Sequence, residues 1–439
     1  MERKGDLREK GKILWFVNSV FTEKDINDQL EGHSKGWLVT LAHALKARYE
    51  LVIVGIHPNA QNFQGREIST VHLRPKYWKW KFLYSRFLPL SDMNGVLTEQ
   101  MLEVVDRERP DLVHIHGTEE PFINAHTEIR SRGIPVLVSI QGLMMAIENK
   151  FFGGYDRSFI ASFSFYRPFR KPNNFFLPQS LMHRFKRIQK RARSEANVLP
   201  EVEYFEGRTE WDKAITHLLN PRARYFHVDR ILKPAFYSSK MWQSRGKQER
   251  PYIIWTTMGT SLFKGLDTIV ECAKILNERQ HDFIWLVAGV SPDDGSVRAA
   301  KKKCGHSYPK DQINFLGALN AEQLVDQMLT ADIYVSASYI ENSPNNLAEA
   351  MILGMPCIAT LAGGTASYLE HERSGLLTQE GDIWGMAAAI FRLLEQRELA
   401  EKMGKEAYRR ARKRHDRSRA QGQIESAYQY ILSEVHNEN

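Results

Sequence analysis

The stretch "ENSPNNLAEAMILGMP" (Glu341–Pro356) has the features of a short helix that follows a loop. Ser343 is a favourable N-cap, and Pro344 suits the first helical position, where a backbone N–H has no intrahelical partner. Gly354 predicts the end of the helix. Directly upstream, "DIYVSAS" (Asp332–Ser338) is an apolar run that predicts a strand. Together they predict a strand–loop–helix unit with one glutamate at the helix mouth and a second inside the helix.

Short apolar runs alternate with helical patterns along most of the chain. The pattern restarts at about Tyr252, with "YIIWTTMG", "FIWLVAGV", "INFLGA", "DIYVSAS" and "PCIATLAGG" as the apolar runs of the second half. Strand–helix alternation predicts doubly wound parallel sheets, and the restart predicts two of them. In the first half the runs suited to buried parallel strands are Lys12–Val17, Leu51–Ile56, Asp111–His116 and Pro135–Ile140.

This pattern divides the chain into two Rossmann-like domains. The polar stretch "YSSKMWQSRGKQERP" is a suitable linker between them. The region from Phe151 to Ala235 is less regular, which leaves a subdomain or an insertion open there. A long, charged helical pattern ends the chain, and we expect it to lie across both domains. The expected divisions are residues 1–236, a linker at 237–251, residues 252–415 and a C-terminal helix at 416–439 that packs back on the first domain.

The composition is that of a soluble globular protein. Hydrophobic residues make up 43% of the 439 residues, and charged residues make up 26%. The three cysteines show no paired spacing, so neither a disulfide framework nor a zinc site is predicted. No stretch approaches the roughly 18 apolar residues of a membrane span. We therefore expect a cytoplasmic protein.

The net charge of +8 predicts an anionic partner. A phosphorylated ligand or an anionic membrane surface fits, whereas no module typical of nucleic-acid binding accompanies the charge, and nucleic acid is not expected. The basic segment His183–Glu195 is equally well explained as a solvated helix face. The segment Lys76–Leu90 mixes aromatic and cationic residues, as either a peripheral membrane segment or a packed domain wall would.

The loop that begins at Glu341 combines groups suited to a nucleotide sugar. A helix starting at Pro344 presents unpaired N–H groups to a phosphate, and Asn345 and Asn346 add amide donors. Glu349 lies roughly 7 to 8 Å along the helix axis. The two carboxylates could therefore bind the sugar hydroxyls and the ribose diol. A helix glutamate and an exposed loop glutamate without function explain the spacing equally well.

Two further loops follow predicted strands. "TMGTSLFKG" (Thr257–Gly265) carries Lys264, which could neutralise a departing diphosphate or could simply be solvated. "LEGHSKGW" carries Gly32, where the backbone could approach a ligand. His114 and His116 share one sheet face, and core histidines are their commoner explanation. No Asp-x-Asp pair is present, so a carboxylate-bound divalent metal is not indicated.

The segment "YIENSPNNLAEAMILGMPCIATLAGGTASYLEHERSGLL" closely resembles the donor site of the family 4 glycosyltransferases. These are retaining enzymes with the α/β GT-B architecture, in which two Rossmann-like domains face each other across a cleft. Their signature Glu-x7-Glu corresponds here to Glu341 and Glu349. The resemblance covers Tyr252 to about Leu394 and is looser in the N-terminal half.

The resemblance implies a role for individual residues. Glu349 would bind the ribose diol of the donor, Glu341 would contact the transferred sugar, and Lys264 would hold the diphosphate. The base would be bordered by Phe315 and Leu316, and Gly32 would approach the phosphates.

Two positions depart from the family pattern. Most members carry an arginine five residues before the lysine, where Gly259 stands here. Arg208 could substitute for it, or it could be a structural arginine paired with Glu210 or Asp212. Many members also carry a histidine where Gln141 stands, and glutamine can hydrogen-bond to hydroxyls but cannot titrate.

The resemblance implies a retaining transfer from a UDP- or GDP-sugar to a polysaccharide or lipid-linked glycan, without a metal or a separate cofactor. No carboxylate nucleophile can be assigned, and the resemblance implies same-face attack assisted by the leaving phosphate. Two alternatives stay open. One is a UDP-sugar epimerase of the same architecture, and the other is a noncatalytic subunit that binds a nucleotide sugar or a glycan.

Overall fold

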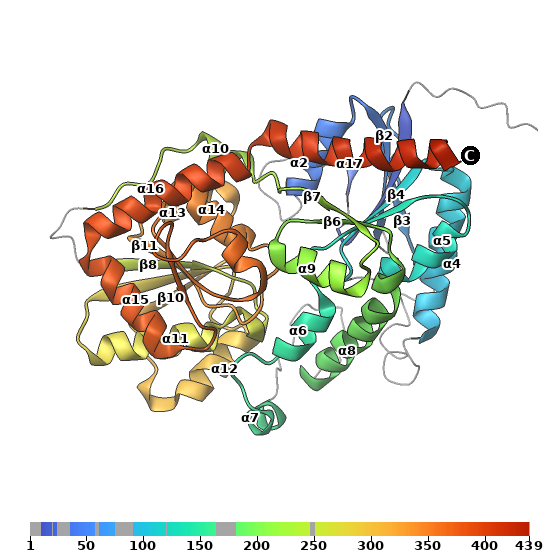
Figure 1. Ribbon diagram of the computed structural model, residues 1–439. Helices are drawn as coiled ribbons and strands as arrows, with labels where there is room; N and C mark the ends of the chain where they lie inside the picture. Colours follow the sequence, from blue (N-terminus) through green and yellow to red (C-terminus); the bar gives the residue numbers. More distant parts are fainter. Residues whose placement is uncertain are drawn as a thin grey trace, which may run out of the picture.

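The computed structural model describes residues 10–19, 21–23, 36–57, 61–74, 91–119, 121–163, 181–245 and 251–438. Two parallel sheets, each flanked by helices, lie side by side (Figure 1). The N-terminal sheet has seven strands in the order β3-β2-β1-β4-β5-β6-β7. Its strands are β1 (Gly11–Val17), β2 (Tyr49–Ile56), β3 (Ile68–Leu73), β4 (Leu112–His116), β5 (Val136–Ser139), β6 (Tyr204–Gly207) and β7 (Arg224–His227).

The C-terminal sheet has six strands in the order β10-β9-β8-β11-β12-β13. This is the doubly wound order, in which the chain leaves the first strand toward one side and later returns to pair on its other side. The strands are β8 (Tyr252–Thr257), β9 (Phe283–Ala288), β10 (Ile313–Gly317), β11 (Ile333–Ser336), β12 (Cys357–Thr360) and β13 (Leu376–Thr378).

Helices cover both faces of each sheet. In the N-terminal half they are α2 (Gly36–Leu45), α4 (Ser91–Glu108), α5 (His126–Arg130), α6 (Met144–Lys150), α7 (Arg157–Ser162), α8 (Leu181–Val198) and α9 (Glu210–Leu219). The later helices are α10 (Pro234–Ser238), α11 (Leu266–Glu278), α12 (Gly295–Cys304), α13 (Ala321–Met328), α14 (Asn345–Leu353), α15 (Ile383–Glu395), α16 (Arg397–Arg414) and α17 (Arg417–Glu438). Among the described residues, no helix combines the length and apolar character of a membrane-spanning segment.

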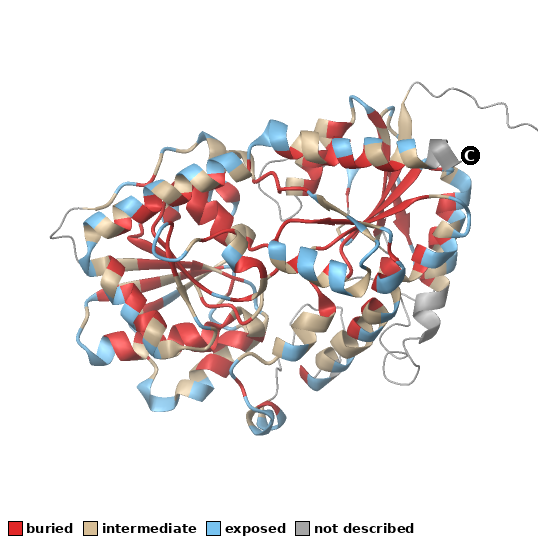
Figure 2. Cartoon of the chain, in the orientation of Figure 1, coloured by how far each residue is buried: buried red, intermediate tan, exposed pale blue. Residues whose placement is uncertain are grey.

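The strands are apolar on both sides because both faces of each sheet are buried (Figure 2). In β1, Leu14 and Phe16 join one core with α4, whereas Ile13, Trp15 and Val17 join the opposite core with α2 and α17. The C-terminal sheet is arranged in the same way, with α11, α12 and α15 on one face, α13 and α14 on the other, and α16 contributing to both cores. The expected α/β fold with two parallel-sheet domains is therefore confirmed.

The chain crosses between the two cores twice. Ile231 belongs to the N-terminal core and Leu232 to the C-terminal one. On the return, Ala411 in α16 packs on the C-terminal domain and Ala420 in α17 packs on the N-terminal domain (Figure 1). His415, between these helices, is buried and has Nδ1 2.8 Å from the carbonyl oxygen of Arg230, so the two crossings are adjacent.

The structure refines several expected boundaries. Helix α14 begins at Asn345, with Pro344 as its N-cap, one residue later than Ser343 and Pro344 predict. The helix ends as expected, because Gly354 has a φ of 82°. Within the expected linker, Trp242 is buried and its Nε1 donates to the carbonyl of Ala331, so this part of the stretch packs on the C-terminal domain.

Candidate functional site

Two loops at the carboxyl edge of the C-terminal sheet bring Lys264 and Glu341 together. Lys264 follows β8, Glu341 follows β11, and these two strands are neighbours at the point where the strand order reverses. The Nζ atom of Lys264 lies 2.6 Å from Oε1 of Glu341. Ser338 donates its hydroxyl to the same oxygen at 2.8 Å. Side chains 77 positions apart in the sequence are thus in direct contact.

Glycine at position 265 is required by the way the Lys264 loop packs. The loop ends in a 3-10 turn over Leu262–Lys264, and Gly265 follows with a φ of 78°. A Cβ at Gly265 would lie only 1.9 Å from the carbonyl oxygen of Ala337. The absence of a side chain therefore lets the turn lie against the loop after β11, which carries Lys264 toward Glu341. This is the physical reason for the Lys-Gly pair.

The amino end of α14 faces this ion pair. Its N-cap, Pro344, provides no side-chain hydrogen bond, so no side chain caps the first-turn N–H groups. Lys264, Glu341 and Asn345 line a cavity of about 190 Å³ at this helix end. Asn346 lines it too, but its Nδ2 donates to the carbonyl of Thr257 at 2.8 Å and ties the helix to the end of β8. Positive helix-end potential and Lys264 make the cavity suited to an anion.

Glu349 is buried inside α14, with 5% of its surface exposed. The nearest cation is Lys233, which precedes α10, and its Nζ lies 3.5 Å from Oε1 of Glu349. Burial raises the pKa of Glu349, and Lys233 opposes this only partly. The carboxylate therefore has unused capacity for hydrogen-bond donors such as hydroxyl groups.

The other predicted site residues of the C-terminal domain, Phe315, Leu316 and Gly259, differ in how far they are exposed. Phe315 and Leu316 lie half-buried on β10, where a register shift before Gly317 interrupts the pairing with β9. Gly259 is exposed, and a Cβ placed on it would have no atom within 4 Å. The position therefore has room for the arginine that the family pattern has there.

The N-terminal domain forms the facing wall. Asn342, next to Glu341, donates its Nδ2 to the carbonyl of Ile140 at 2.9 Å. Nη1 of Arg208 donates to the same carbonyl at 3.0 Å, so Arg208 lies at the contact between the domains. Its ion-pair partner is Glu206, with Nη2 2.8 Å from Oε1, and not Glu210 or Asp212. That part of the sequence interpretation is wrong.

Gln141 follows β5 on the same wall, and its Nε2 is buried without a hydrogen-bond partner among the described residues.

A buried glutamate fixes the surrounding loops. Glu195 of α8 accepts the N–H of Met145 at 2.8 Å, and its other oxygen contacts the Thr118 hydroxyl, which lies 3.0 Å from the carbonyl oxygen of Gly142. Burial raises the pKa of Glu195 to about 7.

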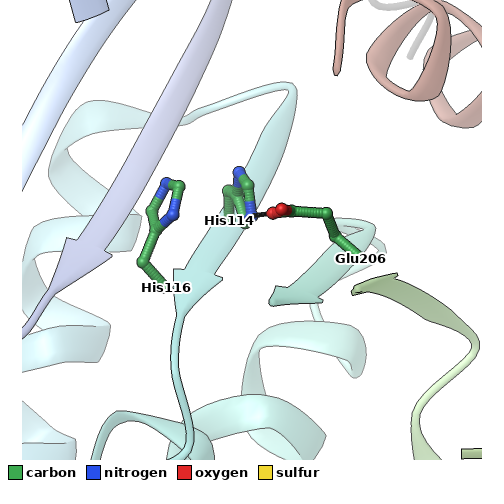
Figure 3. Close-up of side chains that lie close together, drawn as sticks. All are labelled: His114, His116 and Glu206. Carbon is green, nitrogen blue, oxygen red and sulfur yellow. Dashed lines mark hydrogen bonds and ion pairs between the residues drawn. The ribbon is translucent and has the colours of Figure 1, made fainter. Parts of the chain in front are cut away.

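His114, His116 and Glu206 form a buried cluster beneath this wall (Figure 3). One ligating atom from each lies within 4.8 Å of the others, so the group could hold a metal ion. In this structure His114 is fully engaged, with Nδ1 2.7 Å from the Tyr428 hydroxyl and Nε2 2.6 Å from the Ser139 hydroxyl. Burial lowers the pKa of both histidines, which keeps them neutral.

Glu206 is the carboxylate of this cluster, and sequence reasoning missed it. Its burial opposes ionisation, but Arg208 and His114 outweigh burial and lower the pKa of Glu206. Glu206 thus acts as the counter-ion of Arg208. The strand spacing of His114 and His116 indicated half of the cluster, but β6, which carries Glu206, was not predicted.

Some expected site residues lie outside the described part of the chain. These are Gly32 and the aromatic and basic segment Lys76–Leu90. The basic segment His183–Glu195 lies on α8, with Lys186 and Arg193 exposed.

Known proteins resemble this chain in sequence, mainly in its C-terminal half. Residues 240–410 match the family described as "Glycosyl transferases group 1". The chain is 28% identical over 171 residues to the N-acetyl-alpha-D-glucosaminyl L-malate synthase of Bacillus anthracis, covering 39% of this chain and 43% of that protein. It is 27% identical over 178 residues to the amylovoran biosynthesis glycosyltransferase AmsK of Erwinia amylovora, covering 39% of this chain and 42% of that one. The matched stretches thus span less than half the length of these relatives.

Solved structures resemble the whole chain. Sucrose-phosphate synthase from Thermosynechococcus elongatus has a TM-score of 0.71 at 15% identity, covering 97% of this chain and 100% of that one. Anabaena HepE, solved in complex with UDP and glucose, has a TM-score of 0.64 at 14% identity, covering 96% and 100%. The chain therefore has the GT-B fold, and its C-terminal domain matches the group 1 glycosyl transferases.

Proposed function

We propose that this chain is a retaining glycosyltransferase of family 4. It transfers a sugar from a nucleotide-diphosphate sugar to a polysaccharide or lipid-linked glycan. The observation that carries the proposal is the contact between Lys264 and Glu341 at the uncapped amino end of α14, with Glu349 buried farther along the same helix. The match of residues 240–410 to group 1 glycosyl transferases supports it.

The donor diphosphate binds at the amino end of α14. The first-turn N–H groups and Lys264 provide the positive potential that a diphosphate needs. In the ligand-free protein Lys264 is paired with Glu341, so it is already held at the cavity. The diphosphate then shares Lys264 with Glu341. Because the helix end and Lys264 neutralise it, donor binding does not require a divalent cation.

Glu349 binds the ribose diol, and Glu341 contacts the transferred sugar. A buried carboxylate with only one cation at 3.5 Å gains from two hydroxyl donors. The half-buried Phe315 and Leu316 border the base. On the facing wall, Gln141 has a free amide donor for a sugar hydroxyl.

The reaction proceeds by same-face attack. The bond between the anomeric carbon and the β-phosphate oxygen breaks, and the electron pair goes to the phosphate. The acceptor hydroxyl oxygen bonds to the anomeric carbon on that face, and its proton passes to the leaving phosphate oxygen. Lys264 and α14 stabilise the charge that develops on the diphosphate. The protein contributes positioning and electrostatic stabilisation rather than a covalent intermediate.

The acceptor belongs to polysaccharide or lipid-linked glycan synthesis. Relatives include the amylovoran enzyme AmsK and a phosphatidylinositol monomannoside mannosyltransferase of Mycobacterium tuberculosis, which support both acceptor types. The basic residues on α8 support contact with an anionic membrane surface from the cytoplasmic side.

The test is product formation. Purified protein is incubated with UDP-, GDP- and ADP-sugars, nucleotide release is measured, and the anomeric configuration of the product is read by proton NMR. Turnover of one base series with retained configuration is the expected result. An inverted product would contradict the retaining mechanism, and a well-folded protein that binds none of these nucleotides would contradict the proposed function.

A further inference from the structure

A buried arginine without a counter-ion lies on the N-terminal wall. Arg230 follows β7 and is 8% exposed. Its guanidinium stacks on the ring of Trp37, with Cζ 4.1 Å from the ring centroid. Its Nε and Nη2 atoms have no hydrogen-bond partner in the part of the chain that the structure describes. Among the described residues no carboxylate forms an ion pair with Arg230, whereas Arg208 pairs with Glu206 and Arg414 pairs with Asp229.

Burying a guanidinium without a partner costs several kcal/mol, which makes an isolated one rare. Burial lowers the pKa of Arg230, and repulsion from Arg208 lowers it further, so the surroundings disfavour its charge. Glu206, whose oxygens already meet Arg208, His114 and Ser139, and Glu119 both attract the charge of Arg230. Among the described residues, however, no carboxylate is in direct contact with the Arg230 guanidinium.

Other donors without partners lie around the same ring. Arg208 lies 5.8 Å from the Trp37 ring centroid, and its Nε is unpartnered. The His116 ring lies 6.0 Å from that of Trp37, and both of its nitrogens are unpartnered. Two guanidinium groups make this position repel a cation and attract an anion. A metal ion on His114, His116 and Glu206 would have to overcome that repulsion.

These groups lie where the two domains meet. His116 ends β4, Arg208 follows β6 and Arg230 follows β7, so all three lie at the carboxyl edge of the N-terminal sheet. Arg208 shares the carbonyl of Ile140 with Asn342 of the opposite domain. The donor diphosphate already has Lys264 and α14 in that opposite domain. Arg230 and these donor groups lie in different domains, so an anion on Arg230 can belong to the other member of the reacting pair.

We propose that Arg230, with Arg208 and Trp37, binds an anionic group of the acceptor, a phosphate or a carboxylate. This rests on the proposed glycosyltransferase function. A guanidinium offers paired donors that match both anions, and Trp37 holds the Arg230 plane in place. Arg230 selects acceptors that carry such a group near the hydroxyl that is glycosylated.

The experiment uses calorimetry on the full chain, with inorganic phosphate and succinate as probes, each with and without saturating UDP. Arg230→Met removes the charge, and Arg230→Lys keeps the charge but loses the paired donors. Arg279→Met, on the exposed end of α11, is the control for loss of a surface charge. The better-bound probe distinguishes phosphate from carboxylate as the recognised group.

We expect one probe to bind the wild type and Arg279→Met equally. Its Kd should rise at least about tenfold in Arg230→Met and by a smaller factor in Arg230→Lys, with the Kd of UDP unchanged within about twofold. The melting temperature of ligand-free Arg230→Met should equal or exceed that of the wild type, because an unbalanced buried charge is removed. Arg208→Met should melt lower, because it leaves Glu206 buried without its counter-ion.

Three results would overturn the proposal. The first is that neither anion binds the wild type, and the second is that Arg230→Met leaves the affinity for both anions unchanged. The third is that Arg230→Met weakens UDP binding about tenfold and leaves anion binding unchanged, which would assign Arg230 to the donor diphosphate. Failure of the proposed function gives a different result. UDP, GDP and ADP would then not bind, while phosphate or succinate would still bind in an Arg230-dependent way.

Discussion

Replacing Glu349 by glutamine tests the donor site most directly. The substitution keeps the size of the side chain and one carbonyl oxygen but removes the charge that the ribose hydroxyls would meet. A hydrogen bond to a charged group contributes about 1.5–3 kcal/mol. Loss of one such bond should raise the Kd of the bound nucleotide about 10- to 150-fold.

The structure indicates that this loss will not come from unfolding. Burial already disfavours the charged form of Glu349, and the side chain of Lys233 is 22% exposed and can turn toward water when its partner is neutral. We therefore expect the free energy of unfolding to stay within about 1 kcal/mol of the wild type. Chemical denaturation followed by tryptophan fluorescence measures this value.

The assay is titration calorimetry of UDP, GDP and ADP into the wild type and the variant. Glu322→Gln is the matched control, because Glu322 is an exposed glutamate in the first turn of α13. The control should bind as the wild type does. If Glu349→Gln bound the preferred nucleotide with the Kd of the wild type, Glu349 would have no contact with the ribose and the reasoning from its burial would be refuted.

Three further predictions follow from the same region. In Lys264→Met, the Kd of UDP measured by calorimetry should rise about tenfold or more, whereas the Kd of UMP should change by less than about threefold. The reason is that Lys264 is expected to hold the second phosphate, which UMP lacks. Equal losses of affinity for both nucleotides would contradict this. Gly259→Arg should fold normally, because a Cβ there meets no atom within 4 Å. It should lower the Kd of UDP about three- to tenfold by supplying a second cation. An unchanged Kd would show that the arginine of the family pattern has no role here. Burial raises the pKa of Glu195 to about 7, so the unfolded chain loses this proton at a lower pH than the folded chain. The stabilisation from this group is therefore complete below about pH 4.5 and falls until about pH 7, by about 3 kcal/mol in all. Above that pH it stays low. Glu195→Gln should therefore raise the melting temperature at pH 8 but not at pH 4.5, and an equal shift at both values would rule out titration of Glu195 as the cause.

The apolar strands were the most predictable part of the fold. Mainly apolar runs mark these strands because both faces of a parallel sheet are buried, and the strands found in this way are β1, β2, β4, β5 and β8 to β12. β3, β6, β7 and β13 were not predicted. β3 carries the buried polar residues Ser69, Thr70 and His72, β6 carries the buried Glu206, and β7 begins and ends with an exposed polar residue. Glu206 of β6 has distant partners in His114 and Ser139, which a local pattern does not contain.

The candidate site divides in the same way. Lys264, Glu341 and Glu349 lie in loops and helices with a local signature, so their positions could be predicted. The arrangement of the N-terminal wall could not be predicted, because most of its contacts join residues far apart in the sequence. Arg208 was assigned the wrong partner for another reason, because Glu206, two residues away, lies on a strand that was not predicted.

The return of α17 to the N-terminal domain has a consequence for the order of folding during synthesis. Its Ile424, Tyr428 and Ile431 fill the core around Trp15, and the Tyr428 hydroxyl meets both Trp15 Nε1 and His114 Nδ1. The ribosome makes α17 after the entire C-terminal domain. That domain can pack its two cores first, whereas one apolar face of the first-made sheet is covered by α2 but stays incompletely covered until residues 417–431 emerge. During translation the N-terminal half is therefore the part that most needs chaperone protection.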